Sequence, residues 1–209
     1  MKRTTGVIAA IALALIFTGG QEALAGLDVD LGARVRVGDD TDLFVNISSR
    51  YFKQDSRVVA DLGVRFGNPD DLAVALFLSN RTGKHPDSIW RLRQGGMSWY
   101  EIGLRYRVPL DAWFITTDRR PGPPYGKAYG HWKNGKNSNY RLTDADARNL
   151  VAVRMIHEYY GVSVDVAMDR RASGRSVKAL VNHEYRQRHA KVASSKTGGK
   201  PGKGKGRKK

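Results

Sequence analysis

The sequence contains no cysteine, and this absence excludes several kinds of structure and chemistry. Disulfide bonds, thiolate metal sites and cysteine nucleophiles cannot form. The fold must therefore be stabilised by apolar packing, for which a chain of 209 residues is long enough. The length suits one domain, or one domain followed by a tail.

Long apolar runs and catalytic motifs are also scarce. After Ala25, no stretch is apolar enough to cross a membrane. His157 and His183 each precede a glutamate, as in the HExxH helix of zinc proteases. The second histidine of that motif is missing, because Gly161 and Gln187 occupy its place. Since no GxSxG nucleophile motif occurs either, we predict no catalytic residue, no metal site and no cofactor.

The chain begins with a pattern that is typical of protein export. Two cations at positions 2 and 3 precede an apolar run over 7–17, and an Ala-Leu-Ala sequence ends at Ala25. This layout is that of a secretory signal peptide with an A-x-A cleavage site. An uncleaved membrane anchor is the alternative, but the apolar run is short for one. We therefore expect residues 1–25 to be removed and the mature protein to be periplasmic or secreted.

Acidic residues are few compared with basic ones, and the net charge is +16. Residues 26–190 carry a net charge of +7, and residues 191–209 carry +8 without any acid. An exported protein of this charge is attracted to polyanions such as lipid headgroups, acidic polysaccharide or nucleic acid. The Gly/Lys composition of 191–209 predicts a disordered tail that binds polyanions weakly. Its candidate binding residues are Lys200, Lys203, Lys205, Arg207, Lys208 and Lys209.

One stretch of the sequence recurs without a gap, 78 positions further along the chain. Residues 72–102 match residues 150–180 at two glycines, a serine and an aspartate, and most apolar positions remain apolar. Glycine and serine are the residues that end and begin helices. We therefore predict a three-helix unit that is present twice, over 53–115 and 143–190, with the two first helices packed together.

Helix starts and stops are clearest in the first of these units. Asn68 is expected to cap a helix with Pro69 at its first position, and Gly83 is expected to end it. This helix is apolar on nearly all sides, so it should be central. Ser98 and Glu101 predict a capping box at the start of the third helix. The corresponding signals in the second unit are Thr143, Asp146, Gly161, Ser163, Gly174 and Ser176.

Residues 26–52 are predicted to form a β-hairpin. Apolar and polar residues alternate over 27–37 and again over 43–47, and turn-forming residues lie between them. For 42–52 the alternative is a helix with Asp42 as its N-cap. The fold class predicted from the whole pattern is mainly α, with this short hairpin in front of the two units.

Residues 116–142, between the two units, are rich in proline, glycine and aromatic residues. This composition predicts a loop without regular secondary structure. Aromatic rings stack on sugars or bases, and cations bind phosphate or carboxylate, so the loop is a candidate ligand-binding segment. The alternative is that the rings fold inward as a lid over the helices. The candidate residues are Tyr125, Lys127, Tyr129, His131, Trp132 and Lys133.

The sequence PGPPYGKAYGHWK at 121–133 resembles a segment that joins two helical halves in an uncharacterised family of exported bacterial proteins. The resemblance extends over most of the mature chain and includes its LAVALFL and HEYYGV stretches. It implies the same arrangement of two helical halves in an exported protein. It implies no particular activity.

These features favour a non-enzymatic binding or structural protein whose partner is anionic, such as surface polysaccharide, lipid headgroups or cell wall. One alternative is a hydrolase of envelope polymers, which requires two of His131, His157 and His183 beside a carboxylate in one cleft. Another is a nucleic-acid-binding protein, because residues 86–114 have the outline of a helix-turn-helix. The apolar and acidic character of 110–114 argues against a recognition helix there.

Overall fold

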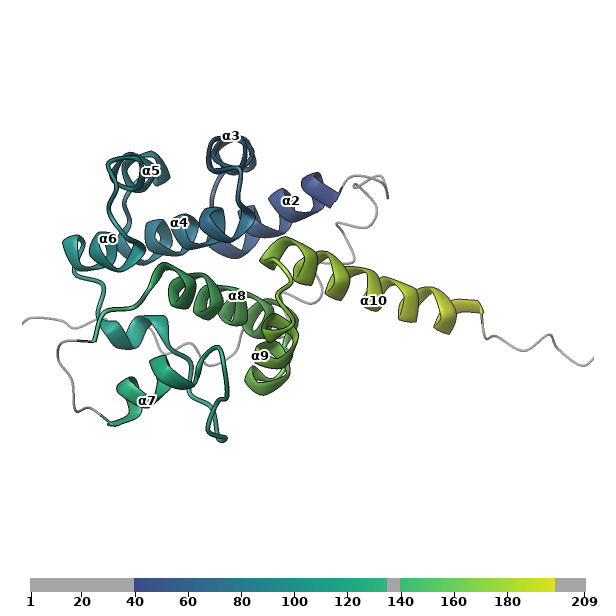
Figure 1. Ribbon diagram of the computed structural model, residues 1–209. Helices are drawn as coiled ribbons and strands as arrows, with labels where there is room; N and C mark the ends of the chain where they lie inside the picture. Colours follow the sequence, from purple (N-terminus) through teal and green to yellow (C-terminus); the bar gives the residue numbers. More distant parts are fainter. Residues whose placement is uncertain (1–39, 135–139, 198–209) are drawn as a thin grey trace, which may run out of the picture.

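The computed structural model describes residues 40–134 and 140–197, and the protein is mainly helical there, as predicted (Figure 1). Within these two ranges no β-strand occurs. The elements are α2 (Asp40–Phe52), α3 (Ser56–Phe66), α4 (Pro69–Thr82), α5 (Pro86–Gln94), α6 (Trp99–Arg105), the 3-10 helix η1 (Leu110–Trp113), α7 (Gly126–Asn134), α8 (Asp144–Tyr160), α9 (Val164–Ala172) and α10 (Val177–Thr197).

α4 is the central helix of the segment from α4 to α6, which is called the first unit below, and the segment from α8 to α10 is called the second. The side chain of Asn68 accepts a hydrogen bond from the N–H of Asp70 at 2.9 Å and caps the helix, as predicted. Gly83 ends α4 in the left-handed conformation, with a φ of 66°. Every residue from 72 to 79 is buried, which agrees with the nearly continuous apolar sequence of this helix.

The second unit, α8 to α10, has the same local signals. Thr143 and Asp146 form the predicted capping box, and Gly161 ends α8 with a φ of 62°. Ser163 accepts a hydrogen bond from the N–H of Val166 and starts α9. A shift of 78 positions superposes both ends of α5 on those of α9, and the same shift relates the start of α6 to the start of α10.

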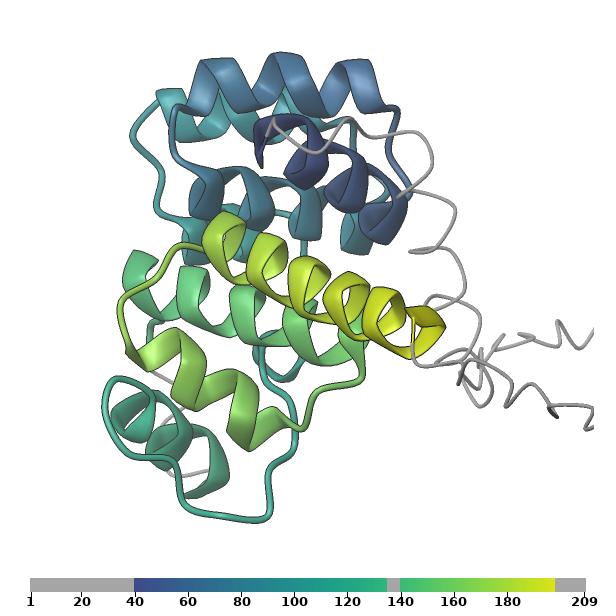
Figure 2. The same cartoon turned by 90° about the vertical axis from the view of Figure 1, so that its right-hand side faces the viewer.

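The two units are packed through their first helices, α4 and α8. α5 packs beside α4, and α9 packs beside α8. The third helices cross over, because α10 contacts α4 while α6 contacts α8. α10 lies between α2 and α8 (Figure 2), and α7 lies at the opposite end of the molecule from α3 and α5 (Figure 1). Each unit therefore completes its core with helices of the other.

Arg93 of the first unit binds the start of α8. Its guanidinium donates to Asp144 Oδ2 at 2.5 Å and to the carbonyl of Met97 at 2.9 Å. The other oxygen of Asp144 accepts the N–H of Trp99 at 2.8 Å. One carboxylate of α8 thereby holds both an arginine of α5 and the first N–H of α6, where the helix dipole favours a negative charge.

Arg171 of the second unit binds the start of α4 in the same way. Its guanidinium donates to Asp70 Oδ2 at 2.9 Å and to the carbonyl of Arg175. The other oxygen of Asp70 accepts the N–H of Val177 at 2.7 Å. The donors in this contact, Arg171 and Val177, lie 78 positions after Arg93 and Trp99, the donors in the first. The two units are therefore joined by matching contacts.

The N-terminal part of the described chain differs from the prediction. The expected strand at 43–47 is wrong, because these residues belong to α2, the helical alternative. Leu43, Phe44 and Ile47 are buried, a spacing of three and four positions that places them on one face of a helix. The other expected strand, 27–37, and the predicted signal peptide lie outside the described residues.

Two other segments are helical where irregular structure was expected. α7 lies within 116–142, and buried or half-buried apolar side chains recur there at helical spacing, namely Tyr125, Ala128, Tyr129 and Trp132. α10 continues to Thr197, so disorder over 191–197 is wrong. No glycine or proline interrupts that segment before the pair of glycines that follows it. Residues 198–209 of the predicted tail lie outside the described residues.

Candidate anion-binding surface

The two tyrosines of the candidate ligand-binding segment point into the protein. Tyr125 is 3% exposed and donates to the carbonyl of Met168 at 3.3 Å. Tyr129 is 1% exposed and donates to the carbonyl of Ile115 at 2.9 Å. Burial raises the pKa of both hydroxyls above the ordinary value for tyrosine. Neither ring has a free face on which a sugar or a base could stack.

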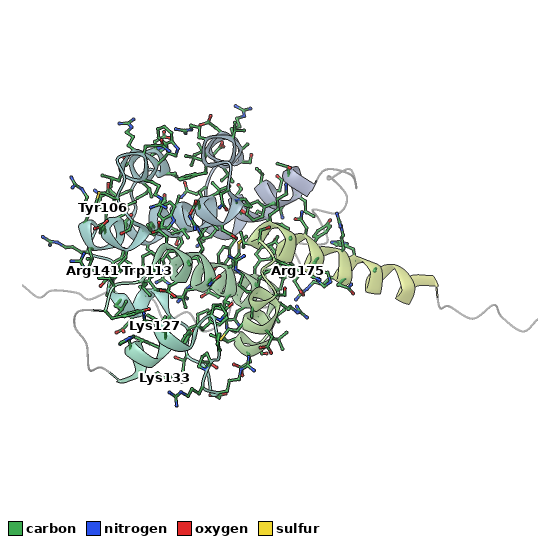
Figure 3. All side chains as sticks on the ribbon, viewed as in Figure 1. Tyr106, Trp113, Lys127, Lys133, Arg141 and Arg175 are labelled. Carbon is green, nitrogen blue, oxygen red and sulfur yellow. The ribbon has the colours of Figure 1, made fainter. Side chains whose placement is uncertain are left out.

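The other rings of the segment are also paired within the protein. Trp132 stacks on Phe114 with a centroid distance of 4.7 Å, and its indole N–H donates to Asp111 at 2.7 Å. His131 stacks on Tyr140 at 4.4 Å. The segment therefore takes the inward arrangement. Its cations reach solvent: Lys127 and Lys133 are exposed on α7, and Lys133 also donates to the carbonyl of Thr117 (Figure 3).

The three histidines of the hydrolase hypothesis lie on three different helices. His157, on α8, contacts the carbonyl of Val162 through Nδ1 at 2.7 Å. His183, on α10, lies 3.6 Å from the carboxylate of Glu184, while His131 belongs to α7. In the described part of the chain, no three His, Cys, Asp or Glu side chains are placed to hold a metal ion. Among the described residues, no two of these histidines share a hydrogen bond or ion pair with one carboxylate.

A buried arginine that the sequence did not single out joins three parts of the fold. Arg154, only 8% exposed, donates to Glu158 at 2.6 Å and to the carbonyls of Ala112 and Phe114. Tyr51 of α2 donates to the same Glu158 at 2.6 Å, and its pKa is raised well above the ordinary value by burial and by that carboxylate. The cluster therefore attaches α2 and η1 to α8. The only sign of this cluster in the sequence is Arg154 itself, a cation within the otherwise apolar run 150–156.

Nearly all described carboxylates are bound by groups of the protein itself. Glu101 accepts hydrogen bonds from the N–H and the hydroxyl of Ser98, which lower its pKa. Arg65 bonds to Asp87 at 2.5 Å and lowers the pKa of that carboxyl. Further ion pairs join Asp71 to Arg148, Asp165 and Asp169 to Arg119, and Glu184 to Arg170.

The positive charge that remains lies on the surface. Acids that cap helices or pair with arginines are not available to neutralise the other cations. Those cations keep their water and can exchange it for an external anion. The exposed cations that take no part in the ion pairs of the described residues are Lys53, Arg57, Arg81, Lys84, Arg91, Arg105, Arg107, Arg120, Lys127, Lys133, Arg141 and Arg175.

Two of these arginines border an open groove beside α6. The groove has a volume of about 580 Å³ and is open to solvent. Leu104, on its wall, is 50% exposed. Arg141 lies at the same side of the molecule as Tyr106, the residue that follows α6 (Figure 3). The lining residues are Gly95, Gly96, Met97, Glu101, Leu104, Arg105 and Arg141.

No known protein family, curated protein or solved structure matches the chain. Function must therefore be argued from the geometry itself. None of the described helices combines the length and the apolar character that a bilayer crossing needs. The described surface presents exposed guanidinium and ammonium groups. It also has a groove that is lined by arginine and by an exposed leucine.

Proposed function

We propose that this is an exported, non-enzymatic protein that binds an anionic component of the cell envelope. The proposal rests on one observation, the different placement of acidic and basic side chains. Carboxylates form ion pairs and hydrogen bonds within the fold, whereas many cations face solvent. Positions 26 to 190 alone carry a net charge of +7, and positions 191 to 209 add +8. Both parts should contribute to binding.

The scaffold of this protein consists, in our proposal, of two copies of one three-helix unit. Support comes from the helix ends that coincide after a shift of 78 positions and from the matching contacts of Arg93 and Arg171. A duplicated unit of this kind has a rigid core and free outer faces. Such a scaffold suits a binding protein, because the exposed cations are held in fixed positions.

The other functions considered from the sequence have less support. A hydrolase needs an acid and a base within reach of one substrate, and each of the three candidate histidines contacts a different group of the protein. For DNA reading, the element after α6 would have to enter the major groove. That element is η1, a 3-10 helix of four residues whose Trp113 is buried.

The test compares two chains, residues 26–209 and residues 26–197, so that every described residue is retained. Binding would be measured to a carboxylated polysaccharide, to anionic lipid vesicles and to duplex DNA over a range of salt concentrations. We expect the longer chain to bind and to lose at least about tenfold in affinity as salt rises, because the attraction is screened. The shorter chain should bind more weakly but still measurably.

Two results would contradict the proposal. One is the absence of binding to all three polyanions at low salt. The other is an affinity that does not change with salt, which would mean that contacts other than charge dominate. A neutral polysaccharide and vesicles of uncharged lipid serve as matched controls for the two envelope ligands.

A further inference from the structure

The end of α6 exposes an apolar side chain in an unusual setting. Leu104 is 50% exposed, and it shares the groove with Met97. A single exposed leucine is common on protein surfaces and needs no explanation by itself. The groove is more informative, because Arg105 and Arg141 border the same leucine.

Two further arginines flank this surface in the chain. Arg107 lies two positions after the last residue of α6 and is exposed, with a φ of 59°. Arg91 is exposed one turn before the groove, where its carbonyl accepts the N–H of Gly95 at 3.0 Å. The one acid in the groove, Glu101, is held by the capping box with Ser98. The groove therefore has two arginines and one exposed apolar side chain in its lining, and two more arginines lie close to it in the sequence.

The corresponding region of the second unit is covered. The residue 78 positions after Leu104 is Asn182, which is 3% exposed. α10, which carries Asn182, is packed against α2 as well as α4, α8 and α9, whereas the helices packed most closely on α6 are α5 and α8. An apolar residue is therefore exposed at the position where the other unit buries a polar one. Of the two corresponding faces, the one on α6 leaves an apolar side chain in contact with water.

We propose that this face docks onto an anionic lipid membrane, an inference that rests on the proposed function and names one ligand for it. Leu104 enters the boundary between headgroups and acyl chains, and Arg91, Arg105, Arg107 and Arg141 bind lipid phosphates. Arginine side chains suit this role because their stems lie along apolar surface while the guanidinium reaches the headgroups. Apolar contact and attraction to anionic lipid then act together, as in interfacial helices.

A membrane fits this face better than a polysaccharide does. Sugar rings are usually held by stacking on aromatic side chains, and the rings of the 121–133 segment are buried or stacked on other protein groups. The groove is open to solvent, so it does not enclose a sugar unit. Contact with a polar polymer does not remove an exposed leucine from a polar environment, whereas insertion into a bilayer lowers its free energy by taking its apolar surface out of water.

The first experiment measures partitioning of the chain 26–209 onto vesicles of phosphatidylglycerol and phosphatidylcholine. We expect Leu104→Ser to weaken binding roughly fivefold to tenfold, because the apolar contact is lost. Arg105→Ser and Arg141→Ser should each weaken it about fivefold. The matched controls are Val64→Ser, an apolar residue of α3 that is 84% exposed, and Arg175→Ser. Val64→Ser should change binding less than about twofold, and Arg175→Ser should weaken it less than either groove variant does, because it removes one charge outside the proposed contact.

The second experiment uses the absence of cysteine to place a single polarity-sensitive dye. Attached to Leu104→Cys, the dye should shift to the blue and gain intensity when anionic vesicles are added. Attached to Val64→Cys, it should keep the emission that it has in water. Both positions are exposed, so labelling should not unfold the protein, and an unchanged urea midpoint would verify this for each variant.

The outcomes separate this inference from the proposed function. If vesicles bind but Leu104→Ser behaves like Val64→Ser and the dye at position 104 stays in water, the α6 face is not the docking surface. If the polysaccharide binds and vesicles do not, the membrane inference fails while the proposed function stands. If no polyanion binds, both fail.

Discussion

The two three-helix units that we propose for this protein are alike inside and different outside. Inside, α5 and α9 have corresponding ends, and Arg93 and Arg171 make matching contacts with aspartates of the other unit. Outside, α6 stops after seven residues, whereas α10 continues for 21. The core contacts tolerate little change because they interlock, while the surfaces are free to take different roles.

The third helices show how the difference arises. Trp113 of η1 lies against Gly103 of α6, in a space that a larger side chain would fill. The residue 78 positions after Gly103 is Val181, which is buried in α10. The glycine of α6 therefore leaves room for Trp113, which belongs to the connection between the units. α10 has a valine at the corresponding position and extends beyond the other helices (Figure 1).

The largest expected effect comes from breaking the more buried of the two matching contacts. The side chains of Arg171 and Asp70 are 9% and 13% exposed, against 21% and 27% for Arg93 and Asp144. Arg171→Ala should cost about 3–5 kcal/mol in the free energy of unfolding, because Asp70 keeps a buried charge without its partner. Arg93→Ala should cost about 2 kcal/mol, since water can reach its site.

Urea denaturation of the three proteins would measure these free energies. Arg175→Ala is the control, because only the backbone carbonyl of this exposed residue takes part in the contact. Its effect should stay within about 0.5 kcal/mol. A larger loss for Arg93→Ala than for Arg171→Ala would show that burial does not rank the two contacts.

A smaller effect is expected at position 103, where the first unit has a glycine and the second unit has a larger residue at the corresponding position. A Cβ added to Gly103 would lie 2.9 Å from Cζ2 of Trp113, and that ring is 1% exposed. Gly103→Ala should therefore destabilise the protein by about 1–3 kcal/mol through overpacking. Gly63→Ala is the matched control, because its Cβ would meet Leu72 at an ordinary 3.5 Å.

Gly63→Ala should instead raise the free energy of unfolding by about 0.5–1 kcal/mol, because alanine favours the helical state. The two variants are best compared by thermal and urea denaturation under the same conditions. If Gly103→Ala were as stabilising as Gly63→Ala, the close contact with Trp113 would not hold in solution.

The smallest effect concerns the place where α6 ends and its counterpart α10 continues. Arg107 has a φ of 59°, a left-handed conformation that is costly for residues other than glycine. Arg107→Gly should raise the free energy of unfolding by about 0.5 kcal/mol, the relief of strain being partly offset by the greater freedom of the unfolded chain.

Arg105→Gly is the control for this change, because Arg105 is still part of α6. It should lower the free energy of unfolding by about 0.5 kcal/mol. Opposite signs for two arginines that are close neighbours in the chain are the expected result of urea titrations. Equal losses in both variants would mean that the backbone at position 107 is not strained.

Much of the local structure could be predicted, whereas the candidate binding surface could not. Asn68, Ser98 and Thr143 marked helix starts correctly, since a cap acts on residues two or three positions away. The proline and glycine content of 116–142 concealed α7, although its apolar residues have helical spacing. Arg105 and Arg141 lie 36 positions apart in the chain, so nothing in their local sequence indicates one groove.

The sequence by itself determined where most helices begin and end, because capping side chains and left-handed glycines act within one turn of the chain. The tertiary structure alone decided that Arg93 and Arg171 bind aspartates of the opposite unit, that the aromatic rings turn inward and that Leu104 stays exposed. These outcomes depend on which distant surfaces meet, and burial against a partner far away in the chain leaves little trace in local sequence.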